Sequence, residues 1–189
     1  MHLETDIPAK KNTATTRTFR EPICSLSALG EPIADFAARC GEKIRRQNSS
    51  ASILTVYIQT NHFAKQEPQY ARSFTVTFTA PTNSTLQLVH AAKFALRQVY
   101  RDGFQYKRAG VLLGGLVHRP NGLQTALFQP INPEKHAALM STLDGVNARF
   151  GRNTVQTAAQ TIGTAAKLTR QNQLSPGYTT KWEEVMRVG

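Results

Sequence analysis

The chain has 189 residues and a formal net charge of +11, from 23 lysines and arginines against 12 acidic residues. This length fits one ordinary domain with an appendage, or two small domains. Hydrophobic residues make up 40%, enough for a core, but no apolar run approaches the roughly 20 residues of a membrane-spanning helix. The charge favours a polyanion partner such as nucleic acid, because each cation placed on a phosphate releases a counterion; the alternative is a basic protein with a solvated surface.

The N-terminal segment is polar and charged and contains Pro8 where a secretory signal would need an apolar stretch. We therefore expect a linker over residues 1–12 and a cytoplasmic protein. Residues 13–20 are rich in β-branched side chains and predict a strand that buries Phe19. Strict alternation along this strand puts Arg17 on the same face as Phe19.

Residues 25–47 predict a helix, in which Pro32 fits only if it lies in the first turn. The apolar residues recur at the spacing of one helical face, at Ile33, Phe36, Ala37, Cys40 and Ile44. Cys40 in this stripe is expected to be a small core residue. The two cysteines, Cys24 and Cys40, have neither metal-ligand spacing nor a disulfide framework.

Residues 53–60 and 72–79 alternate between apolar and polar side chains, which predicts two strands with one buried and one open face. Residues 84–87 read Ser-Thr-Leu-Gln, a capping box that predicts the start of a second helix ending at Tyr100. Residues 106–117 predict the fourth strand. The expected fold is α+β: a four-stranded, mainly antiparallel sheet in the order β-α-β-β-α-β, with both helices on one face.

Beyond this domain, expected over residues 13–117, proline and glycine predict a linker over 118–131. A small, mostly helical region is expected over 132–189. Its first helix starts at Asn132-Pro133, with an apolar stripe of Leu139, Leu143 and Val146. A weaker helical stretch covers 157–171.

Several segments together resemble the C-terminal portion of Y-family translesion DNA polymerases of the UmuC type, the catalytic subunit of bacterial DNA polymerase V. They are Thr16–Phe19, Arg39–Gln47, Leu54–Thr60, Tyr106–Val111 and Leu174–Trp182. The resemblance covers nearly the whole chain, and it rests on the order and spacing of these segments. It implies a role in translesion synthesis, SOS mutagenesis and DNA repair.

In that family the β-α-β-β-α-β unit is the little finger domain, which lies in the major groove of template–primer DNA and contacts phosphates on both strands. The resemblance implies this DNA-binding role here. The expected phosphate contacts are Arg17, Arg20, Arg72, Lys107 and Arg108. Such contacts position the duplex and carry no sequence information. An ordinary surface salt bridge is the alternative for Arg17.

The family's polymerase chemistry needs carboxylates that hold two Mg²⁺ ions, and these belong to a palm domain that precedes the little finger. Acidic residues are scattered in this sequence, and the only adjacent pair is Glu183-Glu184. We therefore expect no catalytic residue, metal site or cofactor in this chain, and no polymerase activity from it alone. The resemblance implies the C-terminal piece of a polymerase or a truncated reading frame.

Residues 124–128, Gln-Thr-Ala-Leu-Phe, resemble the pentapeptide by which bacterial polymerases bind the sliding β-clamp. Leu127 and Phe128 would enter an apolar pocket, and Gln124 would hydrogen-bond at its rim. The alternative is that Leu127 and Phe128 pack on the sheet or the next helix. Family resemblance also implies a UmuD-type dimer and RecA as partners, for which residues 132–189 offer a docking surface.

Two other functions fit the same strand order. A stand-alone RNA-binding module would need exposed aromatic residues on the central strands to stack bases, and only Tyr57 qualifies. A protein-interaction adaptor would have no nucleic-acid role. Sequence-independent DNA binding with clamp tethering is the preferred hypothesis.

Overall fold

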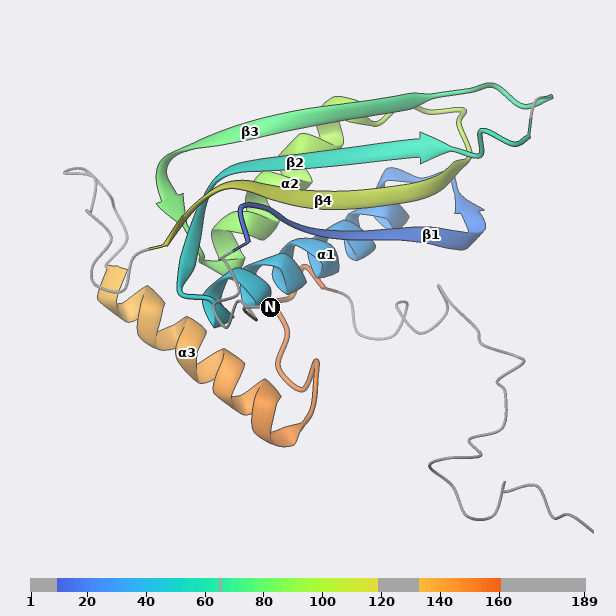
Figure 1. Ribbon diagram of the computed structural model, residues 1–189. Coiled ribbons are helices and arrows are strands. Elements are labelled where there is room, and N and C mark those ends of the chain that lie inside the picture. Colours follow the sequence, from blue (N-terminus) through green and yellow to red (C-terminus); the bar gives the residue numbers. More distant parts are fainter. Residues whose placement is uncertain (1–9, 65, 119–132, 161–189) are drawn as a thin grey trace, which may run out of the picture.

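The computed structural model describes residues 10–64, 66–118 and 133–160 (Figure 1). The elements are β1 (Thr13–Ile23), α1 (Leu26–Arg46), β2 (Ser49–Thr60), β3 (Ala71–Thr82), α2 (Thr85–Val99), β4 (Tyr106–His118) and α3 (Pro133–Phe150). The four expected strands and the first two helices are confirmed. β2 begins four residues before the expected position, because Ser49 to Ser52 continue the ladder that β2 forms with β4.

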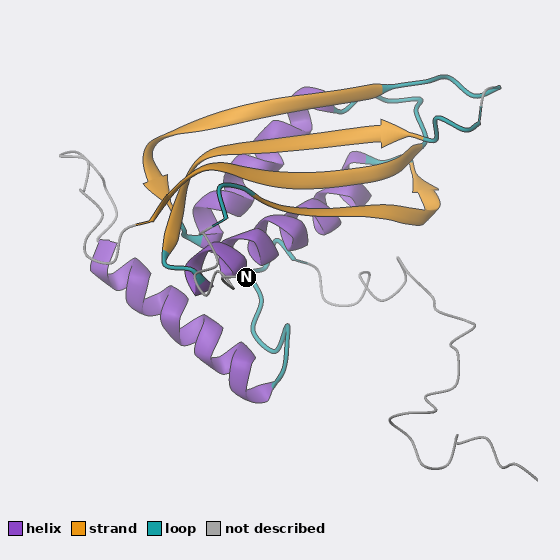
Figure 2. Cartoon of the chain, in the orientation of Figure 1, coloured by secondary structure: helices purple, strands orange, loops and turns teal. Residues whose placement is uncertain are grey.

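The sheet has the strand order β1-β4-β2-β3, and all three neighbouring pairs are antiparallel. Both α1 and α2 lie against one face of this sheet, and none of the described helices covers the other face (Figure 2). The expected α+β fold is therefore confirmed. β4, the last strand in the chain order, lies between β1 and β2, so residues far apart in sequence become neighbours on the open face.

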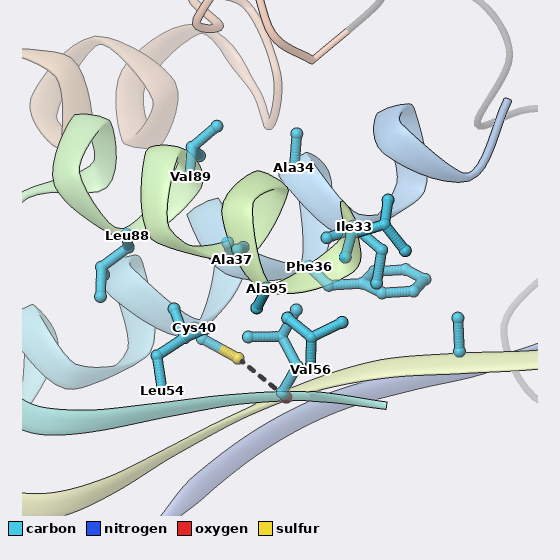
Figure 3. Close-up of a cluster of buried hydrophobic side chains, with 14 of the residues drawn as sticks. Ile33, Ala34, Phe36, Ala37, Cys40, Leu54, Val56, Leu88, Val89 and Ala95 are labelled. Atoms are coloured by element: carbon cyan, nitrogen blue, oxygen red, sulfur yellow. Dashed lines mark hydrogen bonds between the residues drawn. The ribbon is translucent and has the colours of Figure 1, made fainter. Parts of the chain in front are cut away.

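The core lies between the helices and the sheet (Figure 3). Apolar residues of the central strands point toward the helices, among them Leu54, Val56 and Val111, each 0% exposed. Their polar neighbours along each strand point to the open face, as alternation predicts. Cys40 lies in this core, and its thiol donates to the backbone carbonyl of Val111 over 3.7 Å (Figure 3). The expected role of Cys40 as a core residue is confirmed.

Pro32 lies in the interior of α1, seven residues into the helix, so its expected place in the first turn is wrong. Ser25 is the N-cap, and its side chain accepts from the backbone N–H of Ala28 over 3.2 Å. A proline at position 32 leaves the carbonyl of Ala28 without its usual helical donor. Ala28 is exposed, so an unpaired carbonyl costs little there and the helix continues through the proline.

The expected capping box at the start of α2 is also wrong. Ser84 is the N-cap residue, but its side chain makes no cap hydrogen bond. The Gln87 side chain instead accepts from the hydroxyl of Thr82, and the Ser84 N–H donates to that hydroxyl over 3.2 Å. The Ser84 hydroxyl lies 3.2 Å from Nδ1 of His136 in α3. A tertiary contact has replaced the local cap.

α3 begins at Pro133, as expected, and ends before Gly151, which has a φ of +105°. Its expected apolar stripe is wrong in register: Leu139 is 49% exposed, whereas Met140 is 2% exposed. Met140 contacts the start of α2, where the N–H of Thr85 lies 3.3 Å from its sulfur. The first residues of the weaker helical stretch expected over 157–171 are not helical, because residues 157–160 form turns and irregular structure. Residues 161–171 lie outside the described residues.

In the described part of the chain, no helix is long and apolar enough to cross a membrane. The same residues contain no group of three or more histidine, cysteine, aspartate or glutamate side chains that could hold a metal ion.

Candidate nucleic-acid interface

The helix-free face of the sheet is lined by hydroxyl and amide side chains in cross-strand rows. One row runs through Thr16, Gly110, Tyr57 and Ser73, and the next through Thr18, Arg108, Gln59 and Ala71. A third row carries Thr55 and Thr75, whose hydroxyls lie 2.9 Å apart. We call this surface the open face. Its side chains are hydrogen-bond donors that suit phosphate and sugar oxygens.

No carboxylate occurs in these rows among the residues that the structure describes. The acidic side chains it describes lie on the helices, in the connections, or in the irregular part of β1: Glu21, Glu31, Asp35, Glu42, Glu67, Asp102 and Asp144. A phosphate backbone laid on the open face therefore meets hydroxyls and cations without like-charge repulsion.

Arg108 lies on the open face near the start of β4, one of the two central strands of the sheet. Its guanidinium is 6.0 Å from the centroid of the Tyr57 ring on β2, which fits a cation–π contact. The Tyr57 ring lies across Gly110, where a Cβ atom would come within 2.6 Å of the ring and 2.8 Å of Thr16. Arg108 is exposed, so its charge is both oriented by Tyr57 and open to a ligand.

Lys107 and Arg20 meet where β1 leaves its regular pairing. The register between β1 and β4 shifts between Thr18 and Ile23, and Lys107 alone faces this longer stretch of β1. The Lys107 ammonium donates to the backbone carbonyl of Arg20 over 2.6 Å. Lys107 therefore fixes the bulge in β1 in addition to contributing charge, while the Arg20 side chain is exposed.

Arg17 and Arg72 lie at the two edges of the sheet. Arg17 on β1 pairs with Ala109, and Arg72 on β3 pairs with Ile58, which itself pairs with Ala109. The two central members of this row, Ala109 and Ile58, are buried against the helices. Arg17 and Arg72 belong to the same row, so both arginines leave the edge strands on the helix side of the sheet. Alternation therefore holds for Arg17 without a local exception.

All five expected phosphate contacts lie at the same end of the sheet, near the first residues of β4 and the last residues of β2. Within the described chain, the side chains of Arg17, Arg20 and Arg72 have no hydrogen-bond or ion-pair partner. Other cations are engaged: Arg45 pairs with Asp144 over 2.6 Å, and Lys43 donates to the carbonyl of Ala14 over 3.0 Å. The five residues form what we call the basic end.

Sequence reasoning missed the hairpin that joins β2 to β3 at the basic end. In this hairpin the Phe63 side chain is 80% exposed, and the centroids of the Phe63 and His62 rings lie 3.8 Å apart. Nothing in the sequence separates Phe63 from a core phenylalanine, because its exposure depends on how the hairpin folds. The clamp-peptide residues Gln124, Leu127 and Phe128 lie outside the described residues, as does the tail with Trp182.

Tyrosines fix the base of this hairpin and the nearby turn. The Tyr70 hydroxyl donates to the carbonyl of Val99 over 2.7 Å, and the Tyr106 hydroxyl donates to the carbonyl of Arg101 over 2.8 Å. A hydrogen bond to Asp102 raises the pKa of Tyr100 to about 12, and burial raises the pKa of Tyr106. The hydroxyls of Tyr100 and Tyr106 stay protonated donors at neutral pH, so the basic end keeps its shape.

Residues 10–127 match the model of the impB/mucB/samB family C-terminal domain. The chain belongs to this family. The match covers all four strands and both helices of the sheet domain. A second match, to a domain of unknown function (DUF4113), covers residues 137–188 and so includes most of α3.

Named relatives agree with this assignment. The chain is 32% identical over 189 residues to Protein UmuC of Salmonella typhimurium, covering 100% of this chain and 44% of that protein. It is 33% identical to Protein MucB of Escherichia coli, covering 97% of this chain and 43% of that one. The chain thus spans less than half the length of these relatives, and it is the UmuC-type C-terminal region that it matches.

Solved structures give a weaker likeness. The insertion ternary complex of Dbh DNA polymerase aligns with a TM-score of 0.47 and 14% identity, covering 61% of this chain and 33% of that one. A chimera of Dbh and Dpo4 aligns with a TM-score of 0.48 and 15% identity, covering 63% and 32%.

Proposed function

We propose that the chain binds duplex DNA without sequence preference, as the DNA-gripping part of an error-prone translesion polymerase that acts in cytoplasmic SOS repair. The observation that carries this proposal is the open face: hydroxyls and the Arg108 guanidinium, free of carboxylates in the described rows, at the end of the sheet that carries the four other expected cations. Family membership and the net charge of +11 support the same reading.

The geometry suits a groove flanked by two phosphate backbones. Arg17 and Arg72 stand on the outer strands of a four-stranded sheet, three interstrand spacings or about 14 Å apart at the backbone. The major groove of B-DNA is about 12 Å wide. Arg17 and Arg72 leave the sheet on the helix side of its edges, so each would reach a phosphate backbone by extending around its edge strand, while Arg108 and the hydroxyls face the groove. None of these contacts needs a particular base.

The proposal assigns no chemical step to the described residues. Nucleotide transfer in the proposed parent polymerase would need carboxylates holding two Mg²⁺ ions, and the described residues contain no such cluster. Their part would be to hold the template–primer duplex in position. This use of binding energy for positioning is itself a large component of enzymatic rate enhancement.

The proposal is tested by replacing Arg17, Arg72 and Arg108 with alanine in the 189-residue chain. A plot of log affinity against log salt concentration has a negative slope, and each lost phosphate contact makes this slope less steep by about 0.9. We expect weaker binding to a blunt duplex of arbitrary sequence and a slope about 2 to 3 units shallower. Fluorescence anisotropy over a salt series measures both quantities. Lys107 is left in place because its loss would also disturb the bulge in β1.

A matched control removes charge from the other side of the molecule. Lys93 and Arg97 lie on α2, which covers the opposite face of the sheet (Figure 2). Their replacement by alanine should leave the salt slope nearly unchanged. If the control lowers the slope as much per charge as the arginine variant, the open face and basic end do not hold the DNA.

Clamp tethering is a separate part of the proposal. Residues 124–128 follow β4, which ends at His118, and are similar to clamp-binding pentapeptides. Leu127 and Phe128 would supply the apolar anchors, with Gln124 at the rim of the pocket. Docking of a UmuD-type dimer and RecA on residues 132–189 belongs to the same proposal.

Replacing Leu127 and Phe128 with alanine should abolish binding to purified β-clamp and leave duplex affinity intact. Surface plasmon resonance with immobilised clamp measures the first effect, and anisotropy with duplex DNA measures the second. Equal clamp affinity of variant and parent would reject the peptide assignment without touching the DNA-binding proposal.

A further inference from the structure

The hairpin between β2 and β3 extends past the basic end of the sheet (Figure 1). It presents Phe63 with 80% of its surface exposed, more than any other large hydrophobic side chain among the described residues. An apolar ring this exposed gains little from its own fold, since apolar stabilisation scales with the area removed from water. Its hairpin leaves the sheet at the end that carries the basic residues, which points to a ligand shared with the nearer of these cations.

The hairpin holds Phe63 in a defined place. The side-chain nitrogen of Gln69 lies 3.1, 2.9 and 3.1 Å from the carbonyls of Asn61, Ala64 and Glu67. The Thr60 hydroxyl donates to the other end of the same amide over 3.2 Å. The Phe63 N–H donates to the Asn61 side chain over 3.2 Å. One glutamine thus ties both arms of the hairpin together and holds the backbone that carries Phe63.

Phe63 continues a strip of side chains that starts on the open face. The His62 ring lies 3.8 Å from Phe63 with 38° between the ring planes, and its Nδ1 lies 3.5 Å from the Gln59 amide nitrogen. Gln59 pairs directly with Arg108, whose guanidinium lies over Tyr57 at 6.0 Å. The Tyr57 ring, the Arg108 guanidinium and the Gln59 amide on the open face are therefore followed by the His62 and Phe63 rings on the hairpin.

This strip has the chemistry of a nucleobase platform. Sites for single-stranded nucleic acid combine cations that track the backbone with aromatic rings on which bases stack, because every base has a π face. A paired base inside a duplex offers no free face to Phe63. Charge complementarity selects a nucleic-acid ligand over an apolar protein surface, since His62, which contacts the Phe63 ring, also contacts Gln59, and Gln59 pairs with Arg108.

We propose that Phe63 and His62 form a stacking site for an unpaired DNA base next to the duplex that the open face holds. This inference rests on the proposed DNA-binding function and adds a preference for the junction between double-stranded and single-stranded DNA. Phe63 supplies the free ring face, His62 supports the ring from one side, and Gln69 acts as a positioning residue.

The test compares two DNAs that differ only in unpaired bases: a blunt duplex and the same duplex with a short 5′ overhang. The parent chain should bind the overhang DNA more tightly. Phe63→Leu keeps an apolar side chain but removes the ring, and it should weaken overhang binding about fivefold or more while duplex affinity stays within about twofold. Phe63→Trp should restore the preference. With 2-aminopurine as the first unpaired base, the parent and Phe63→Trp should quench fluorescence and Phe63→Leu should not.

Phe150→Ala is the matched control, because Phe150 is another exposed phenylalanine, 66% exposed, beside a cation on α3. It should change neither affinity. The inference is overturned if Phe63→Leu binds overhang DNA as the parent does, or if it weakens both DNAs equally. Binding of the blunt duplex by the variant with Arg17, Arg72 and Arg108 replaced tests the proposed DNA-binding function alone. Failure of the stacking site is therefore distinguishable from failure of duplex binding.

Discussion

Gly110 shows how closely the open face is fitted at the scale of single residues. A Cβ atom at this position would lie 2.6 Å from the Tyr57 ring and 2.8 Å from the Thr16 methyl group, distances at which something must move. Tyr57 in turn lies beneath the guanidinium of Arg108. The small residue therefore allows the aromatic ring to lie flat and to orient the Arg108 cation.

We expect Gly110→Ala to destabilise the fold by about 1–3 kcal/mol, the usual cost of overpacking. In a Tyr57→Ala background the same change should cost less, because the closer of the two clashes is gone and only the contact with the Thr16 methyl group remains. Urea denaturation of the parent, the two single variants and the double variant measures this coupling. Additive costs would mean that the Tyr57 ring does not lie across Gly110 in solution.

The limits of sequence reading are visible at these residues. Alternation correctly placed Leu54, Val56 and Ala109 in the core, because side-chain period is a local property of a strand. The contact of Tyr57 with Gly110 depends on the register between β2 and β4, which lie 53 residues apart at this pair. No local pattern encodes that register, so the role of Gly110 was not predictable.

At the scale of elements, tertiary contacts override local signals at the helix ends. The sequence of residues 84–87 satisfies a capping box, yet Gln87 bonds Thr82 and Ser84 faces His136 of α3. The side of α3 that meets the other helices carries His136, Met140 and Asp144, spaced four residues apart. This side includes a carboxylate and a histidine, so a search for apolar periodicity selected Leu139 instead.

The joint between α3 and the sheet domain centres on Arg45. Its guanidinium binds both carboxylate oxygens of Asp144, at 2.6 and 2.7 Å, and also donates to the carbonyl of Asn83 over 2.7 Å. Two parallel charge-assisted bonds of this kind are stronger than neutral ones. Because the Arg45 side chain is only 10% exposed, solvent cannot replace Asp144 fully.

We therefore expect Asp144→Ala to cost about 1.5–3 kcal/mol, the range for hydrogen bonds to charged groups. The loss should appear mainly as faster amide hydrogen exchange in α3, measured by mass spectrometry, with smaller changes in β2 and β4. The matched control is Glu42→Ala, which removes the carboxylate partner of the exposed Arg46 on α1 and should cost less than about 1 kcal/mol. Equal protection of α3 in Asp144→Ala and parent would contradict the joint.

At the scale of the whole molecule, the sheet separates two surfaces. The open face lies on one side, and α3 packs beyond the helix layer on the other (Figure 1). The sequence predicted the cations one by one, but their gathering at one end follows from the strand order β1-β4-β2-β3. Under the proposed function, this arrangement would let α3 contact a protein while DNA occupies the open face.

The separation predicts that the two surfaces act independently. Asp144→Asn removes one negative charge and loosens α3, but it lies behind the helix layer, and a charge is largely screened beyond about 8 Å at physiological salt. Duplex affinity measured by anisotropy at that salt should therefore stay within about twofold of the parent, although stability falls. Arg108→Ala should do the reverse: duplex affinity falls while hydrogen exchange in α3 stays as in the parent. A large loss of DNA affinity in Asp144→Asn would show that the position of α3 shapes the open face, and the two surfaces would then have to be treated as one coupled site.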